Sequence, residues 1–197
     1  MAHIDYYFTP LSPFTYIAGD GLEKVAAAHG ATIKYKPMDI MELFGRTGGT
    51  PPGQRHVNRQ EYRLQDLRRS AAAAGLPVNM KPAHWPTNPA PACYAIIGAQ
   101  SAGADVGALS QAFARACWAE ERDIADDSVI REVLEANGFE ASLADSSLLS
   151  GAEEYAANLE DAINAGAFGA PFYITGEERF WGHDRLDQLD MHLAGKL

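Results

Sequence analysis

The order of strand and helix patterns at the two ends of this chain constrains its fold more than any other feature. Residues 3–8 alternate between polar and apolar side chains and are rich in aromatic residues, which predicts a β-strand. After a short break, residues 14–25 place apolar side chains at helical spacing, and residues 32–36 alternate again. A strand, a helix and a second strand in this order usually form two parallel strands with a right-handed crossover.

The boundaries of the first helix and the elements at the C-terminal end follow from local signals. We expect one helix from Pro13, whose missing N–H costs nothing in a first turn, to Gly30, which stops it. Near the C-terminus, residues 171–175 predict a strand, and residues 179–181 predict its hairpin partner after a turn. The segment 182–184 then opens a last helix.

Helical patterns fill the middle of the chain, after a loop rich in Gly and Pro at residues 45–53. Ser150 and Glu153 form the pattern of a capping box, which predicts that the last of these helices begins there. The predicted helical segments are residues 59–74, 91–102, 106–120, 128–136 and 151–165.

The complete order is βαβ, a helical block and then ββα. This order matches an α/β fold of the thioredoxin type with an all-helical insertion and a sheet that mixes parallel and antiparallel strands. We therefore expect a thioredoxin-like domain formed by residues 1–40 and 166–197, and a helical insertion domain formed by residues 41–165.

The charge and the hydropathy pattern exclude several classes of partner. The net charge of −10 argues against nucleic acid, because the phosphate backbone needs a basic surface. No apolar run is long enough to span a bilayer, so no membrane partner is expected. Residues 1–13 lack a basic stretch followed by an apolar run, so we expect no secretory signal and a cytoplasmic location.

The chain contains two cysteines, Cys93 and Cys117, which lie far apart in the sequence. Because they form no CxxC pair, neither a redox dithiol nor a cysteine-rich zinc site is indicated. Each lies on an apolar helical stripe, which predicts buried core thiols. The histidines show no metal-ligand spacing, so no metal site is expected.

Ser12 stands between the end of the first strand and the start of the first helix. On local rules it is a helix N-cap, because serine before proline is common at this position. The same position offers a second role, since a helix N-terminus has free N–H groups and a partial positive charge that stabilise an anion.

Two segments far apart in the sequence favour the second role. Ser12-Pro13-Phe14-Thr15 has the layout of the thioredoxin redox motif Cys-Pro-x-Cys, with Ser12 and Thr15 at the two cysteine positions. The segment 169–172, Gly-Ala-Pro-Phe, resembles the cis-proline segment that faces this motif. Taken alone, Pro171 is equally compatible with a proline that begins a strand.

Together with a third block, these segments establish a resemblance over essentially the full length of the chain. The chain resembles the 2-hydroxychromene-2-carboxylate isomerases, which are relatives of the kappa-class glutathione transferases and have a DsbA-like fold. The residues that carry the resemblance are 5–8, 12–16, 169–172 and 180–186.

The resemblance implies that glutathione is the cofactor. It implies that the Ser12 hydroxyl forms a hydrogen bond with the glutathione sulfur, and that the backbone of Ala170, before Pro171, pairs with the cysteinyl part. His183 and Asp184 stand where the family binds the γ-glutamyl end, and Asp184 would receive its ammonium group. The alternative for Asp184 is a helix N-cap, and both roles can coexist.

The resemblance also implies a basic residue for the glycyl or the substrate carboxylate, and we expect Arg59, against the alternative of a solvated helix arginine. Thr50 stands where the family often has an asparagine before a Pro-Pro pair, so that contact is altered. Asn88 either faces the site or caps the next helix. Apolar walls of the substrate site are expected from Phe8, Leu11 and Trp85, although core packing is the alternative for Trp85.

The activity implied is a glutathione-dependent isomerisation between 2-hydroxychromene-2-carboxylate and trans-o-hydroxybenzylidenepyruvate in aromatic degradation of the naphthalene type. It proceeds by thiolate addition, bond rotation and elimination, on a small aromatic carboxylate, in a homodimer. Two alternatives stay open: a kappa-type transferase or peroxidase that uses the same thiolate, and a redox-inactive DsbA-like binding module.

Overall fold

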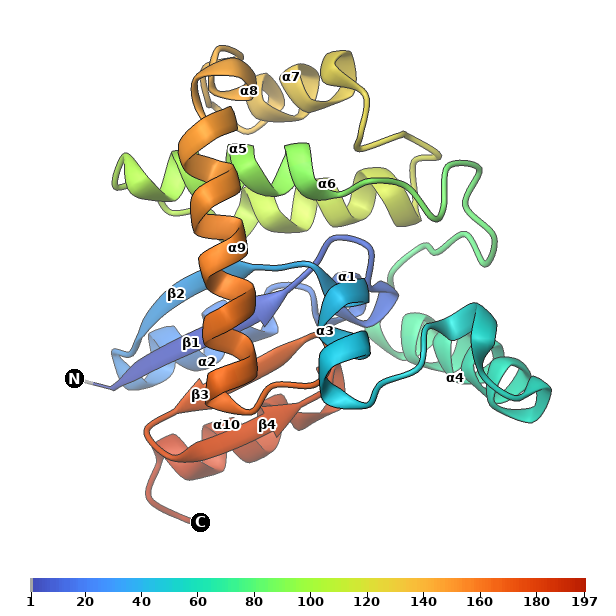
Figure 1. The fold of residues 1–197 in the computed structure, drawn as a ribbon. Helices are drawn as coiled ribbons and strands as arrows, with labels where there is room; N and C mark the ends of the chain where they lie inside the picture. The colour runs from blue at the N-terminus through green and yellow to red at the C-terminus, as the bar shows by residue number, and fades with distance from the viewer. Residues whose placement is uncertain (1) are drawn as a thin grey trace.

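A four-stranded mixed sheet organises the fold (Figure 1). The computed structural model describes residues 2–197 and places the strands in the order β2-β1-β3-β4. Strand β1 (His3–Phe8) pairs parallel with β2 (Thr32–Pro37) and antiparallel with β3 (Phe172–Thr175), which continues into the hairpin partner β4 (Glu178–Trp181). The predicted combination of a parallel pair and a C-terminal hairpin in one sheet is confirmed.

Helices surround the sheet and form a second layer above it (Figure 1). The helices that pack on the sheet or beside its strand ends are α1 (Pro13–Ala18), α2 (Gly21–His29), α3 (Ile40–Thr47), α4 (Val57–Ala74), α9 (Leu148–Ala165) and α10 (Leu186–Leu193). The upper layer contains α5 (Ala90–Ser101), α6 (Gly107–Trp118), α7 (Asp127–Ala136) and α8 (Leu143–Ser146). Two short 3-10 turns, η1 (Pro52–Gln54) and η2 (His183–Arg185), precede α4 and α10.

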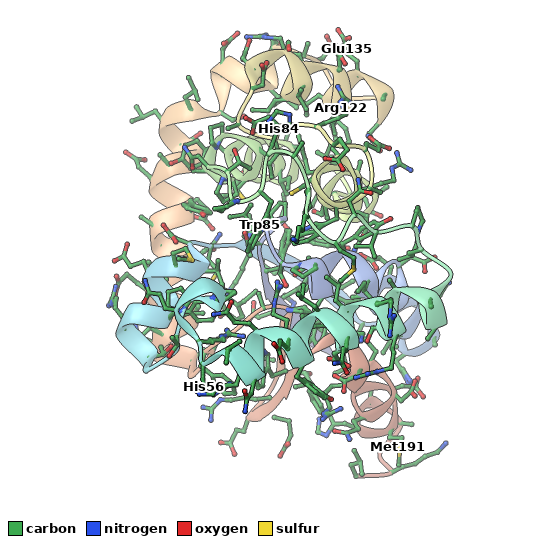
Figure 2. The ribbon with its side chains drawn as sticks, turned by 90° about the vertical axis from the view of Figure 1, so that its right-hand side faces the viewer. His56, His84, Trp85, Arg122, Glu135 and Met191 are labelled. Atoms are coloured by element: carbon green, nitrogen blue, oxygen red, sulfur yellow. The ribbon has the colours of Figure 1, made fainter. Side chains whose placement is uncertain are left out.

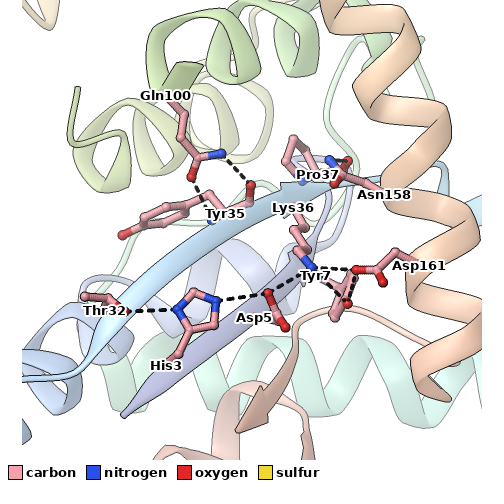
Figure 3. A network of polar contacts seen from close by, with 10 residues as sticks. All are labelled: His3, Asp5, Tyr7, Thr32, Tyr35, Lys36, Pro37, Gln100, Asn158 and Asp161. Carbon is pink, nitrogen blue, oxygen red and sulfur yellow. Dashed lines mark hydrogen bonds and ion pairs between the residues drawn. The ribbon is translucent and has the colours of Figure 1, made fainter. Parts of the chain in front are cut away.

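Helix α9 runs from the upper layer down across one face of the sheet (Figure 1). Polar contacts attach it there (Figure 3). The Lys36 ammonium lies 2.9 Å from Asp5 Oδ1 and 2.5 Å from Asp161 Oδ2, and the Tyr7 hydroxyl donates to the same Asp161 oxygen at 2.6 Å. Asn158 Nδ2 donates to the carbonyl of Pro37 at 3.1 Å. These contacts connect α9 to both parallel strands.

Strand β2 lies at an edge of the sheet, and a glutamine from the upper layer covers part of that edge. The Gln100 amide accepts a hydrogen bond from Tyr35 N and donates one to Tyr35 O, both at 2.9 Å (Figure 3). These bonds satisfy main-chain groups that an edge strand would otherwise leave free.

The apolar core on the α1 side of the sheet is continuous with the interior of the upper helical layer. It joins strand residues such as Tyr6 and Phe8 to helix residues such as Phe113 and Trp118, all of them buried. The proposed division into residues 1–40 with 166–197, and residues 41–165, stays a prediction.

Two of the expected elements are different in the structure. The prediction of a single first helix is wrong. Helix α1 ends before Gly19, which has a φ of 57°, and α2 begins after Asp20. The loop expected at residues 45–53 begins three residues later, at Gly48, because α3 extends to Thr47. Asp39 caps α3, because its Oδ1 accepts hydrogen bonds from the backbone N–H groups of Met41 and Glu42.

The predicted capping box at Ser150 and Glu153 is also wrong. Helix α9 already begins at Leu148, so Ser150 lies inside its first turn. Gly151 in the same part of α9 lies against α5, where a Cβ on it would lie 2.6 Å from the Tyr94 Cβ. A glycine at this position allows the two helices to pack closely.

Candidate active site

Ser12 lies where the chain leaves β1 and enters α1. Its backbone is extended (φ −85°, ψ 119°), and its Oγ accepts a hydrogen bond from Thr15 N at 3.3 Å, so it caps the helix. The same hydroxyl donates to the carbonyl oxygen of Ala170 at 3.0 Å. The helix-cap geometry and the contact with the distant segment therefore coexist in one side chain.

The segment that faces Ser12 begins β3. The Ala170–Pro171 peptide bond is cis, as the resemblance implies. The Pro171 carbonyl accepts a hydrogen bond from Gly182 N at 3.0 Å, which connects this segment to the turn after β4. The structure thus brings Ser12, Ala170 and Pro171 together.

The turn after β4 places His183 against helix α1. Its imidazole stacks on the Phe14 ring with 5.1 Å between centroids and 18° between planes. Burial lowers the pKa of His183 below its ordinary value, so the ring is neutral at pH 7. The Asp184 side chain is exposed and pairs with Arg185 at 2.7 Å. The capping alternative for Asp184 is not seen, because Asp184 lies inside η2, before α10 begins at Leu186, and it forms no cap hydrogen bond.

Two tryptophans support the loop that presents Ser12. Trp118 Nε1 donates to the Pro10 carbonyl at 3.0 Å, and Trp85 Nε1 donates to the Leu11 carbonyl at 3.2 Å. The two indoles also contact each other, with 5.6 Å between centroids. Trp118 is fully buried and Trp85 is half-buried, at the junction of the upper helices and α4 (Figure 2).

Helix α4 contributes arginines to this region. Arg59, the residue expected from the resemblance, is exposed. Arg63, one turn further along, is half-buried, and its guanidinium carbon lies 5.8 Å from the centroid of the Trp85 ring. The sequence interpretation missed Arg63. Its position on one helical stripe with the buried Leu67 and Ala71 is the signal that indicates it.

The remaining expected residues occupy different surroundings. Phe8 is fully buried and stacks on Tyr6 at 4.7 Å, so it supports the loop from inside the core. Leu11 is half-buried, and Thr50 is exposed. Asn88 is also exposed, and its Oδ1 accepts a hydrogen bond from Ala90 N at 3.1 Å, although the N-cap residue of α5 is Pro89.

The site contains no protein thiol. Cys93 and Cys117 are buried, as predicted, and burial raises the pKa of the Cys93 thiol strongly and that of Cys117 to about 12. Thr15 stands at the second cysteine position, and its Oγ1 is buried without a hydrogen-bond partner within residues 2–197. The arrangement can therefore stabilise a thiolate or another anion at Ser12, but a thiol must come from a ligand.

This fold defines a DsbA-like thioredoxin domain, here with Ser12 and Thr15 at the two cysteine positions of the redox motif, and the model of that domain family matches residues 3–194. A 2-hydroxychromene-2-carboxylate isomerase from Pseudomonas putida is 32% identical, over 95% of this chain and 92% of its own length. The chain therefore belongs to the DsbA-like thioredoxin family and, within it, to the 2-hydroxychromene-2-carboxylate isomerases.

Two further comparisons agree with this assignment. A solved structure of a 2-hydroxychromene-2-carboxylate isomerase superimposes with a TM-score of 0.76 at 26% identity, over 98% of this chain and 95% of that one. Glutathione S-transferase kappa 1 from Caenorhabditis elegans is 26% identical, over 94% of this chain and 88% of its own length. The DsbA-like, thioredoxin-type α/β fold is thus established. None of the helices in residues 2–197 is both long and apolar enough to cross a membrane.

Proposed function

We propose that this chain is a glutathione-dependent isomerase that interconverts 2-hydroxychromene-2-carboxylate and trans-o-hydroxybenzylidenepyruvate. The names of the relatives support the isomerisation, and the kappa transferase among them supports the use of glutathione. One observation carries the proposal: the Ser12 hydroxyl occupies the thiol position of a thioredoxin motif, 3.0 Å from the backbone of Ala170, in a site without its own thiol.

The residues around Ser12 fit a tripeptide thiol. In the first turn of α1, Pro13 has no N–H. Thr15 N donates to the Ser12 Oγ, and Tyr16 N donates to the Ser12 carbonyl. The Phe14 N–H therefore remains free to donate to an anion, together with the Ser12 hydroxyl. A ligand N–H that takes over the Ala170 carbonyl would release the Ser12 hydroxyl for the sulfur. Two donors aimed at the sulfur lower the pKa of a bound thiol.

The two ends of the tripeptide have candidate partners in the turn after β4 and on α4. We assign the γ-glutamyl end to His183 and Asp184, whose exposed carboxylate can receive an ammonium group. We assign the glycyl carboxylate to Arg59, which is exposed on α4. We keep Thr50 and Asn88, both exposed, as candidate polar contacts for the second substrate.

When bound, glutathione would supply a thiolate that adds to the conjugated double bond, permits rotation about the resulting single bond and is then eliminated. The contribution of this chain is to favour the charged sulfur at Ser12 and to orient the second substrate. Leu11 and Trp85 provide apolar surface next to Ser12. The reaction needs no oxidant, which agrees with a motif that cannot form a disulfide.

The test is a progress curve with 2-hydroxychromene-2-carboxylate, with and without glutathione, for the wild type and for Ser12→Ala and Ser12→Gly. Replacing an N-cap serine by glycine lowers the stability of the helix by only a few tenths of a kcal/mol, whereas replacing it by alanine lowers the stability by about 1 kcal/mol. Both variants should lose most activity, although Ser12→Gly keeps the helix start. Ser110→Ala, on α6, removes a buried hydroxyl that has no hydrogen-bond partner in residues 2–197, and it should keep wild-type activity.

Binding provides a second, independent measurement. Glutathione should raise the melting temperature of the wild type, because a ligand that binds only the folded state stabilises it. Full activity of Ser12→Gly with glutathione, or equal rates without glutathione, would refute the mechanism. A stable conjugate with a chloroaromatic substrate, or reduction of a hydroperoxide, in place of isomerisation would identify a kappa-type transferase or peroxidase.

A further inference from the structure

The arginines that lack a carboxylate partner are concentrated on helix α4 and just before it. Arginines elsewhere form ion pairs, as Arg46, Arg122 and Arg131 do with Glu160, Glu132 and Asp127, or donate to a carbonyl. This concentration is unexpected in a chain of net charge −10, which offers many carboxylates. Among the described residues, no carboxylate oxygen lies within 4.0 Å of a guanidinium nitrogen of Arg55, Arg59, Arg63 or Arg68, which is the distance limit of an ion pair.

Arg63, like Arg55, is partly withdrawn from solvent, whereas Arg59 and Arg68 are exposed. Arg63 lies on the inner stripe of α4, one turn before the fully buried Leu67, with its guanidinium over the Trp85 ring. It donates no hydrogen bond to any group in residues 2–197. A half-buried guanidinium with five N–H donors and no acceptor favours an anionic ligand.

Arg55 adds a second positive charge to the same space. Its guanidinium carbon lies 5.6 Å from the Phe44 ring centroid, and its Nε donates to the Thr50 carbonyl at 2.7 Å, which leaves both terminal nitrogens free. Burial lowers the pKa of Arg63, and the charge of Arg55 lowers it further. An anion between the two guanidinium groups would remove this repulsion.

The position of Arg63 connects it to the candidate active site. The Trp85 indole that it covers donates to the carbonyl of Leu11, the residue before Ser12. Arg63 therefore lies beside the loop that presents the thiol-binding serine. Arg59, assigned to the glycyl carboxylate, is one turn away and exposed.

We propose that Arg63, supported by Arg55, binds the carboxylate of the second substrate and thereby orients its reactive double bond toward the Ser12 site. The inference rests on the proposed function. A guanidinium can bind a carboxylate through two parallel hydrogen bonds, which fixes direction as well as position. The same chemistry could bind the glycyl carboxylate of glutathione, and the experiment separates these two sources.

The primary measurement is calorimetric binding of trans-2-hydroxycinnamate, which has the ring, the double bond and the carboxylate but no ketone. Arg63→Met should weaken this binding on the order of tenfold, and Arg63→Lys should weaken it less because the charge remains. Arg68→Met is the matched control. Arg68 is an unpaired arginine of the same helix that lines a separate hollow with Met80 and Lys81.

Two further arms identify which carboxylate is bound. The neutral analogue 2-hydroxycinnamyl alcohol should bind equally well to the wild type and to Arg63→Met, because it has no group for the guanidinium. Glutathione and its glycyl ethyl ester should each bind Arg63→Met as they bind the wild type. At saturating glutathione, Arg63→Met should raise the KM for 2-hydroxychromene-2-carboxylate.

Several outcomes would overturn the proposal. Equal hydroxycinnamate affinities of Arg63→Met, Arg63→Lys and Arg68→Met would exclude Arg63 as the ligand. A loss of affinity for glutathione but not for its ester in Arg63→Met would assign Arg63 to the glycyl carboxylate. A wild type that binds no glutathione would refute the proposed function alone, since the hydroxycinnamate series still decides the role of Arg63.

Discussion

The hydroxyl of Ser12 donates a hydrogen bond to the carbonyl of Ala170 at 3.0 Å, across 158 residues of sequence. This contact joins the N-terminal βαβ half of the fold to the C-terminal hairpin at the candidate active site. On the other side of the loop, Trp118 and Trp85 donate to the two carbonyls just before Ser12. The position of the hydroxyl is therefore determined by three distant segments, in addition to the helix that it caps.

We predict that Trp118→Phe destabilises the protein more than Trp85→Phe does. Both substitutions remove an indole N–H that satisfies a loop carbonyl. Trp118 is fully buried, so its Pro10 acceptor stays unsatisfied at a cost of about 1–3 kcal/mol. Trp85 is half-buried, so water can replace its N–H at Leu11. Urea unfolding measures the difference, and equal losses for the two variants would contradict the explanation.

The sequence predicted the parts of the site that depend on local signals. Ser12 before Pro13 indicates a helix start, and the order of elements indicates which strand ends meet. The contacts of Trp85 and Trp118 with the Ser12 loop could not be predicted, because they cross 74 and 108 residues and depend on how the upper helices pack.

Other differences had signals in the sequence that the predictions above did not use. Asp39 with Glu42 three residues later is the pattern of a helix start, and it indicates α3, which extends into the expected loop at residues 45–53. The choice between Arg59 and Arg63 depends on which face of α4 packs inward. The buried Leu67, four residues after Arg63, identifies that face. A resemblance gives the approximate position of a basic residue but not the direction of its side chain.

Two glycines with different surroundings predict opposite effects of substitution by alanine: Gly151 lies at the close contact of α9 with α5, and Gly45 faces open space on α3. Gly151→Ala would place a Cβ 2.8 Å from the Tyr94 Cα, so backbone must shift, and we expect a loss of about 1–3 kcal/mol. Gly45→Ala, in the exposed part of α3, meets nothing within 4 Å and should stabilise by up to about 1 kcal/mol. Thermal unfolding of both variants tests this, and stabilisation by Gly151→Ala would disprove the packing argument.

The burial of both cysteines predicts that the folded protein shows almost no thiol reactivity. Cys93 and Cys117 are both nearly inaccessible, and burial raises the pKa of each thiol, so little thiolate exists at pH 8. A thiol reagent such as dithionitrobenzoate should react with them only after denaturation. Fast reaction of the native protein would show that a thiol is accessible, and it would contradict the burial that excludes a protein thiol from the site.

The contacts of Asp161 on α9 predict a contribution to stability that depends on pH. Burial opposes its charge, but hydrogen bonds from Lys36 and Tyr7 outweigh that effect and hold the pKa of the carboxyl below its ordinary value. The contribution is therefore present above the unfolded pKa, about 3.9 for aspartate, and is lost as the pH falls through the lower folded value. Because half of the side chain is exposed, we expect at most about 1 kcal/mol at pH 7.

Asp161→Asn tests this contribution through a series of urea unfolding curves between pH 7 and pH 2. The variant loses the ion pair with Lys36, so it should be less stable than the wild type at pH 7. The difference should shrink as the wild-type carboxyl is protonated, and the two proteins should converge at the acid end. Glu177→Gln, at an exposed position of the turn between β3 and β4 and without an ion-pair partner in residues 2–197, should show no such pH dependence. A gap between Asp161→Asn and the wild type that stays constant across the series would mean that shape, and not charge, accounts for the loss.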